Sequence, residues 1–126
     1  DPELPGCADA CPSDMYTGCF AISPPLNQTC GLADVSFTNV TQVCFVHSVS
    51  SLTATAGALT MAQPSHDPTD AHFAVNYQIS GMCVEYYGIT GDFSGSDHFD
   101  ALWTINFTGT CFGCTGSSLT ISGDRI

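Results

Sequence analysis

The cysteine spacing Cys111-Phe-Gly-Cys114 offers the most direct chemistry in the chain, because a CxxC pair can be a redox dithiol, half of a zinc site or two structural disulfide ends. A zinc site requires a second CxxC or a Cys/His pair at matching spacing, and the sequence has neither. Gly113 and Gly116 make a poor start for the helix that a thioredoxin-type dithiol opens. We therefore expect Cys111 and Cys114 to end structural disulfides.

The complete cysteine set predicts a framework of four disulfides, because an even number of cysteines in a short chain is typical of crosslinked secreted domains. The eight cysteines are Cys7, Cys11, Cys19, Cys30, Cys44, Cys83, Cys111 and Cys114. Three N-glycosylation triplets begin at Asn27, Asn39 and Asn106. Together these features predict a secreted, extracellular glycoprotein.

Two acidic segments, residues 65–72 and 91–100, contain side chains that bind cations in other proteins. Imidazole and carboxylate groups bind zinc or copper, and carboxylates bind calcium. The candidate ligands are His66, Asp67, Asp70, His72, Asp92, Asp97 and Asp100. Asp-Pro-Thr-Asp at 67–70 is also good turn chemistry, and 91–100 does not match an EF-hand loop. We expect solvated turns and no cofactor, with cation binding as the alternative.

Catalytic patterns are weak. The sequence lacks a GxSxG nucleophile elbow, although a triad is a geometry rather than a string, so a small hydrolase stays an alternative. Glu85 is expected to face solvent from a strand, and Trp103 to fill the core. Tyr86 and Tyr87 are adjacent on a strand and should point in opposite directions, which leaves one of them available for a binding surface.

The elements that would position these residues are β-strands. Residues 72–79 and 99–108 alternate apolar and polar side chains with period 2, and residues 35–49 are rich in β-branched and aromatic residues. Apolar residues also alternate along residues 51–63, and the alternation shifts by one position at Gly57, which fits a bulge. A helix is the competing interpretation for this segment. A last short strand covers 117–123. Loops are expected near 63–71 and 88–97.

This pattern predicts one mainly β domain over residues 1–126. Five to seven short strands separated by turns indicate an antiparallel β-sandwich or barrel. Residues 35–126 would form its β core. Residues 1–34 hold four of the cysteines and five of the prolines, and are expected to be a loop-rich, disulfide-tied strap.

The charge balance excludes several partners. The chain has 126 residues, one Lys or Arg in total and a formal net charge of −11, so it cannot neutralise nucleic-acid phosphates or bind an anionic membrane surface. No apolar run approaches the roughly 18–20 residues of a membrane span, so membrane insertion is not expected either.

Residues 4–11, "LPGCADAC", resemble the opening of fungal CFEM domains, which are secreted eight-cysteine modules for which haem binding is implied. The later cysteines are more widely spaced than in that family, so no residue role is carried over. In composition the chain is similar to small secreted cysteine-rich glycoproteins of filamentous fungi and mushrooms, including immunomodulatory and effector types.

These observations predict a non-catalytic glycoprotein that recognises a cell-surface protein or glycan. A structural wall protein that self-associates through exposed strand edges, or as a homodimer, is the first alternative. A small hydrolase or metal-binding protein that uses 65–72 or 91–100 is the second.

Overall fold

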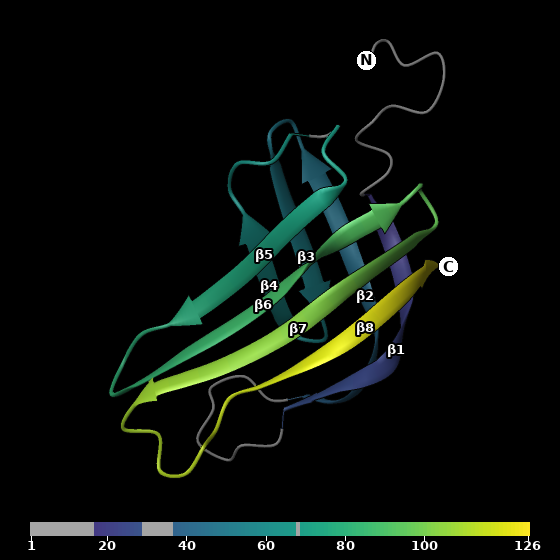
Figure 1. Cartoon of the computed structure of the whole chain (residues 1–126). Helices are drawn as coiled ribbons and strands as arrows, with labels where there is room; N and C mark the ends of the chain where they lie inside the picture. Colours follow the sequence, from purple (N-terminus) through teal and green to yellow (C-terminus); the bar gives the residue numbers. More distant parts are fainter. Residues whose placement is uncertain (1–16, 29–36, 68) are drawn as a thin grey trace.

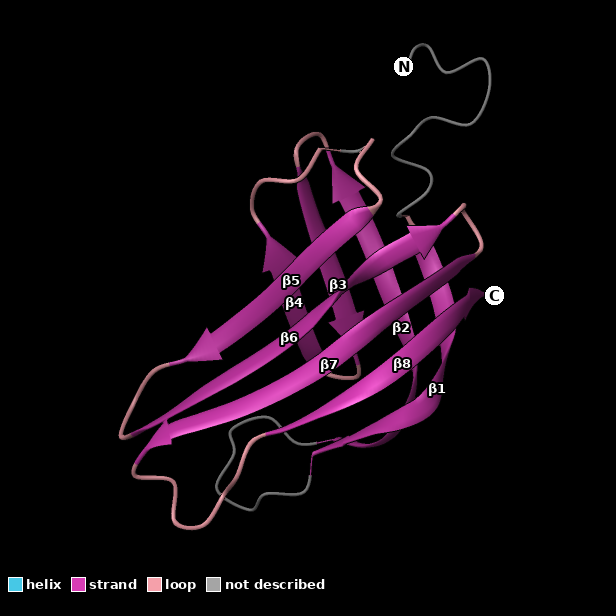
Figure 2. Cartoon of the chain, in the orientation of Figure 1, coloured by secondary structure: helices cyan, strands magenta, loops and turns pink. Residues whose placement is uncertain are grey.

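The computed structural model describes residues 17–28, 37–67 and 69–126, which form eight β-strands (Figures 1 and 2). The strands are β1 Gly18–Gln28, β2 Phe37–Ser48, β3 Ser51–Ala56, β4 Leu59–Gln63, β5 His72–Ile79, β6 Cys83–Ser94, β7 His98–Gly109 and β8 Ser117–Arg125. Among these residues there is no helix that could cross a membrane.

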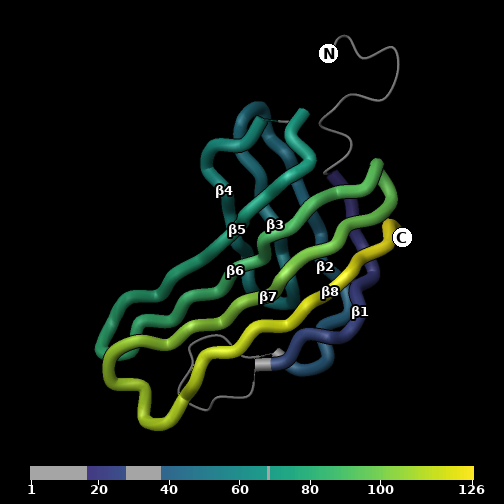
Figure 3. Tube along the Cα trace, in the orientation of Figure 1, coloured from purple at the N-terminus to yellow at the C-terminus, as the bar shows by residue number. Residues whose placement is uncertain are grey.

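Each strand pairs antiparallel with the next along the chain, and β8 pairs with β1 to close a barrel. The closing register runs from Phe20↔Arg125 to Ser23↔Ser122. In Figures 1 and 3, β5 to β8 form one wall and β2 to β4 cross behind it. The prediction of a mainly β sandwich or barrel is confirmed, with the barrel as its observed form.

The barrel has two distinct ends, named here after the turns they carry. The β6–β7 end holds the turns 49–50 and 95–97, the β4–β5 connection and the C-terminal Ile126. The β5–β6 end holds the turns 57–58 and 80–82 and the β7–β8 loop at 110–116. Residues in these two groups are therefore separated by the length of the strands.

The alternation predicted for β7 is confirmed, because side chains on a strand point to opposite faces in turn. Phe99, Ala101, Trp103 and Ile105 are buried inside the barrel, whereas the intervening Leu102 is exposed. β5 follows the same rule at its start, where Phe73 and Val75 are buried. The interior is therefore a packed apolar core.

A phenylalanine cluster fills the interior at the β6–β7 end. Its rings meet edge-to-face or tilted, with centroids 5.1–5.9 Å apart. Such pairs contribute about 0.5–1.5 kcal/mol beyond burial alone. A Cβ on Gly123 would lie 2.2 Å from the Phe99 ring, so this ring needs a residue without a side chain opposite it. The members are Phe20, Phe45, Phe73, Phe93 and Phe99.

Three expectations about the elements are wrong. The strap predicted for residues 1–34 is not loop throughout, because Gly18–Gln28 form barrel strand β1; residues 1–16 and 29–34 lie outside the described ranges. Gly57 is not a bulge within one strand, because it has φ 61° and forms the hairpin turn between β3 and β4. The loop expected at 88–97 is reduced to the turn 95–97, since β6 continues to Ser94.

Candidate binding site

The Cys111–Cys114 loop is a disulfide-anchored turn. Cys111 is bonded to Cys83, and Cys114 is also disulfide-bonded. The two cysteines are therefore not bonded to each other, which confirms the structural interpretation of the CxxC spacing. The Cys114 N–H donates to the Cys111 carbonyl oxygen at 3.0 Å, and Phe112 and Gly113 have φ values of 50° and 92°. Two successive positive φ values are typical of a type I′ turn.

Phe112 is unusual in this turn because it is a large residue in the left-handed region. That conformation costs an L-residue roughly 1–2 kcal/mol and is ordinarily taken by Gly or Asn. Its side chain is 75% exposed, so burial does not offset the cost. The Thr110 N–H donates to the Met82 carbonyl oxygen at 2.8 Å, which fixes the loop to the β5–β6 turn beside the Cys83–Cys111 bond. The Phe112 ring is therefore held in an exposed position by this hydrogen bond and the Cys83–Cys111 disulfide.

A pocket of about 240 Å³ lies between this loop and the β5–β6 turn. Met82 and Phe112 form its exposed rim, with Met82 78% exposed. Glu85 is its most deeply buried member, at 2% exposure, and forms the floor. The complete lining consists of Ser80, Gly81, Met82, Cys83, Glu85, Thr110 and Phe112.

The carboxylate of Glu85 belongs to the interior of the barrel. The Tyr87 hydroxyl, itself buried, donates to Glu85 Oε1 at 2.5 Å, and the Tyr87 ring lies 6.3 Å from that of Trp103. The expectation that Glu85 faces solvent is wrong, because it shares the inward parity of Tyr87 and Ile89 on β6. Trp103 fills the core as predicted. Tyr86 is less buried than Tyr87, as their opposite directions require.

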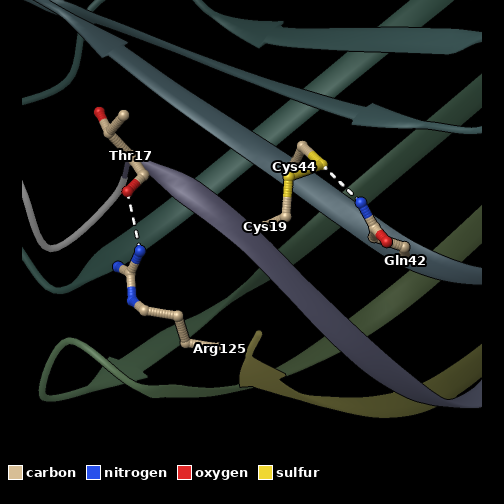
Figure 4. Close-up of a disulfide and its surroundings, with 5 residues drawn as sticks. All are labelled: Thr17, Cys19, Gln42, Cys44 and Arg125. Atoms are coloured by element: carbon tan, nitrogen blue, oxygen red, sulfur yellow. Dashed lines mark hydrogen bonds between the residues drawn. A yellow bond between two sulfur atoms is a disulfide. The ribbon is translucent and has the colours of Figure 1, made fainter.

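The β6–β7 end is tied together by Arg125 (Figure 4). Its Nη1 donates to the Thr17 carbonyl oxygen at 2.8 Å, and its Nε donates to the Ser96 carbonyl oxygen at 2.6 Å. Its guanidinium carbon lies 4.8 Å from the centre of the Phe20 ring, within the range of a cation–π contact. The Cys19–Cys44 disulfide joins β1 to β2 nearby. This end is therefore crosslinked by both covalent and polar contacts.

The histidines of this end have contrasting surroundings. His47 Nε2 lies 3.1 Å from His66 Nδ1, and burial, followed by the charge of His66, lowers the pKa of His47. His98 lies between two carboxylates, with Nδ1 2.8 Å from Asp124 and Nε2 3.2 Å from Asp100. The hydrogen bond to Asp124 is the main cause that raises the pKa of His98.

The seven candidate metal ligands are not gathered into a site. Asp67 Oδ1 accepts hydrogen bonds from the Thr69 N–H and hydroxyl, which lower the pKa of Asp67, and Asp70 accepts the His72 N–H. These bonds confirm the turn chemistry predicted for 67–70. His66 contacts His47, His72 pairs with Asp92, Asp100 with His98, and Asp97 lies 3.9 Å from Arg125. Within the described ranges, no three His, Cys, Asp or Glu residues could hold a metal ion.

The glycosylation triplets place their asparagines at the surface. Asn27, Asn39 and Asn106 are all exposed, and Asn27 Oδ1 accepts the Asn39 N–H at 2.8 Å. Thr29, which completes the first triplet, lies outside the described residues, as do Cys7, Cys11 and Cys30. The Cys19–Cys44 and Cys83–Cys111 disulfides are typical of extracellular proteins.

Neither Glu85 nor Phe112, which line the pocket, was predicted from the sequence as a pocket residue. The inward parity of Glu85 could have been read from the alternation along β6. The exposure of Phe112 could not, because it depends on a distant cysteine at position 83. No family model, no curated protein and no solved structure matches this chain.

Proposed function

We propose that this chain is a secreted, non-catalytic glycoprotein that recognises a cell-surface protein or glycan. Recognition takes place through the Cys111–Cys114 loop and the adjacent pocket. The observation that carries the proposal is Phe112, an exposed aromatic ring in a left-handed conformation between two disulfide-bonded cysteines. Backbone strain of this kind persists where the surrounding structure enforces it and is concentrated at functional positions.

The loop is suited to binding because it is ordered before a partner arrives. Fixing a flexible side chain or loop on association costs free energy, and a preformed loop avoids much of that cost. Aromatic residues and Met are enriched in protein interfaces, and Phe112 and Met82 lie together at the pocket rim. The geometry thus favours a small, rigid contact surface at the β5–β6 end.

Secretion is supported by independent features. The disulfides between described strands require an oxidising compartment to persist. The asparagines of all three triplets are accessible at the surface, where a glycan would not enter the core. The similarity in composition to small secreted fungal glycoproteins points in the same direction, toward an effector or immunomodulatory role.

The two alternatives have less support. His72 and His98 contact carboxylates, and neither ring hydrogen-bonds a serine hydroxyl among the described residues, so no nucleophile is activated there. Self-association through strand edges is disfavoured because β1 and β8 pair with each other.

A binding comparison of two glycine variants tests the proposal. Labelled glycoprotein would be applied to a panel of cells, receptor ectodomains and a glycan array, beside Phe112→Gly and Val49→Gly. Val49 is the matched control, since it is 92% exposed, has φ 32° and lies at the opposite end. We expect Phe112→Gly to weaken binding at least about 10-fold, or 1.4 kcal/mol, and Val49→Gly to leave it unchanged. Equal binding by both variants would contradict the proposal.

A further inference from the structure

Tyr86 and Asn106 lie side by side on the outer surface of the barrel. They are Cα partners across β6 and β7. Both point away from the core, because the adjacent Tyr87 and Ile105 are buried inside it. Asn106 is exposed and begins the glycosylation triplet at 106–108, whereas Tyr86 is partly buried. Directly opposed residues have Cβ atoms about 4.5–5.5 Å apart, so an aromatic ring at one position reaches a group attached to the other.

Two glycines make room for this pair. The Tyr86 ring extends along β6 over Gly88, where an added Cβ would lie 2.7 Å from the Tyr86 hydroxyl oxygen and 3.1 Å from two ring carbons. A Cβ on Gly116 would lie 2.9 Å from Asn106 Oδ1. A side chain at either position would therefore displace the ring or crowd the amide. Because β6 begins at the β5–β6 end, the ring leans away from that end and from the Cys111–Cys114 loop.

The surface around the Tyr86 ring carries groups that suit a sugar. Gln78 lies opposite Tyr86 on β5, and Asn76 and Thr104 lie opposite Gly88 on β5 and β7. The alternation of these strands directs all three outward. Amide groups and hydroxyls both donate and accept hydrogen bonds, as the hydroxyl and acetamido groups of a sugar do.

This part of the surface is also uncharged, in a chain whose formal net charge is −11. Among the described residues of β6 and β7, the outward-facing carboxylates are Asp92 and Asp100, which pair with each other. They lie six residues along each strand from Tyr86 and Asn106, roughly 20 Å away at about 3.3 Å per residue. A neutral saccharide therefore fits this surface better than a basic protein partner does.

We propose that the N-linked glycan on Asn106 packs its first N-acetylglucosamine against the Tyr86 ring. The inference rests on the proposed function, in which the chain is a glycoprotein. The linkage forms when Asn106 Nδ2 attacks C1 of that sugar in a lipid-linked oligosaccharide, displaces its diphosphate and loses one proton. The C–H face of the sugar then covers the aromatic ring and removes apolar surface from water.

Packing of this kind would keep the recognition loop accessible. Asn106 is three residues from the end of β7, and the Cys111–Cys114 loop follows directly. A glycan that moved freely about Asn106 would sweep across this loop. A first sugar fixed on the Tyr86 ring directs the glycan along β6 and β7 toward Gly88, which leaves Phe112 open to a partner.

The experiment uses the glycoprotein secreted from a eukaryotic host grown on ¹³C-labelled glucose. Mass spectrometry of its glycopeptides first establishes whether Asn106 carries a glycan. Nuclear Overhauser effects then locate the first sugar in the folded protein. We expect contacts between its ring protons and the Tyr86 ring, and none with Phe112. An unmodified Asn106, a sugar without contacts to Tyr86, or a sugar in contact with Phe112 would each overturn the inference.

Substitutions at Tyr86 test how firmly the glycan is held. A peptide-N-glycosidase cleaves the linkage at Asn106, and a packed first sugar shields that linkage in the folded protein. Tyr86→Ser should speed release at least about 5-fold, whereas Tyr86→Phe, which keeps the ring, should change it less than about 2-fold. In reduced, urea-unfolded protein the variants should release the glycan at the same rate. Equal release from folded Tyr86→Ser and Tyr86→Phe would overturn the inference.

A second pair of variants moves the ring without removing it. Gly88→Ala places a methyl group where the Tyr86 ring lies and should speed release in the same direction as Tyr86→Ser. Gly81→Ala is its matched control, because a Cβ there would lie 3.7 Å from the Cys83 carbonyl oxygen, an ordinary contact. Equal release from Gly88→Ala and Gly81→Ala would also overturn the inference.

Failure of this inference can be distinguished from failure of the proposed function. A glycan on Asn106 that does not contact Tyr86 contradicts the packing and leaves the glycoprotein intact. An unmodified Asn106 contradicts glycosylation at this triplet, while the Phe112→Gly comparison still decides recognition by the loop. Loss of the loop's role in that comparison would leave the sugar contacts of Tyr86 unchanged.

Discussion

The two ends of the barrel differ in what their aromatic residues do. At the β6–β7 end, the phenylalanine cluster is buried, and Arg125 binds Thr17 and Ser96 across it. At the β5–β6 end, Phe112 is exposed on a strained turn above a pocket with a buried carboxylate. The rings of the phenylalanine cluster are packed away from water, whereas the Phe112 ring at the β5–β6 end is exposed to solvent. Stability and recognition are therefore expected to be separable by mutation.

The largest expected effect is on the phenylalanine cluster at the β6–β7 end. Phe45 is 1% exposed and contacts the rings of the four other members of the cluster. Phe45→Ala should lower the free energy of unfolding by about 3–5 kcal/mol, because it removes buried area and leaves a cavity. Chemical denaturation measures the change, with Phe112→Ala as a control expected to stay within about 0.5 kcal/mol. A loss below about 1 kcal/mol for Phe45→Ala would contradict the packed cluster.

The disulfides give the next comparison, because Cys19–Cys44 lies at the β6–β7 end and Cys83–Cys111 lies at the β5–β6 end. Cys19–Cys44 and Cys83–Cys111 have sequence separations of 25 and 28, so their loop-closure entropies are nearly equal. Replacing either pair by alanines should cost about 2–4 kcal/mol of stability. Only the loss of Cys83–Cys111 should also impair partner binding, measured at a temperature where both variants remain folded. Equal binding by both double variants would show that the loop is not held by this disulfide.

A smaller effect of opposite sign is expected for Phe112→Gly. Glycine relieves the left-handed strain but adds freedom to the unfolded chain, so stability should rise by up to about 1 kcal/mol or stay unchanged. Val49→Gly should change the stability in the same way, and thermal unfolding measures both variants. Binding should separate the two variants, since only Phe112 borders the pocket. A loss of more than about 1 kcal/mol at Phe112 would mean that the ring stabilises the fold.

The smallest effects concern pH and lie at the β6–β7 end. The raised pKa of His98 means that its carboxylate contacts stabilise the fold below about pH 6.5 and that this contribution is lost as pH rises through the folded-state pKa. The lowered pKa of His47 has the reverse sign, because stability is kept above about pH 6.5 and falls as the unfolded state gains a proton first.

Thermal unfolding between pH 5 and 8 checks these signs. His98→Gln should be most destabilising at the acid side of the range, and His47→Gln should flatten the loss of stability on acidification. The carboxylates Asp67, Asp100 and Asp124 act on these rings and stay in place in both variants. If both substitutions changed the pH dependence of stability in the same direction, the environments assigned to His98 and His47 would be contradicted.

The sequence predicted the fold where local pattern decides it. Period 2 along β7 identified which residues of that strand are buried, since a strand presents alternate faces to the core. β1 was missed because Pro24 and Pro25 are unusual in strands, and its register with β2 shifts between Ala21 and Leu26. The hairpin turn at Gly57 was interpreted as a bulge, because both shift the alternation of apolar and polar side chains by one position.

The site was harder to predict because it depends on contacts between distant residues. Glu85 was assigned by residue type, yet its parity places it inside beside Tyr87. The pocket lies between the β5–β6 turn and the β7–β8 loop, which are held together by the Cys83–Cys111 disulfide. This pairing could not be predicted, because eight cysteines allow 105 pairings. Neither the left-handed conformation of Phe112 nor its place at a pocket rim is encoded in the neighbouring residues alone.

Closure of the barrel also bears on the order in which the chain assembles during synthesis. The bond from Arg125 to Thr17 joins residues 108 apart, so it can form only when nearly the whole sequence has left the ribosome. By contrast, each described disulfide belongs to one hairpin or its immediate flank: Cys19–Cys44 joins β1 to β2, and Cys83–Cys111 joins β6 to the loop that follows β7. We expect these hairpins to be crosslinked early and the seam between the first and last strands to form last, since contacts distant in sequence are slow to form. A nascent molecule delayed at that stage would expose two unpaired strands to neighbouring molecules.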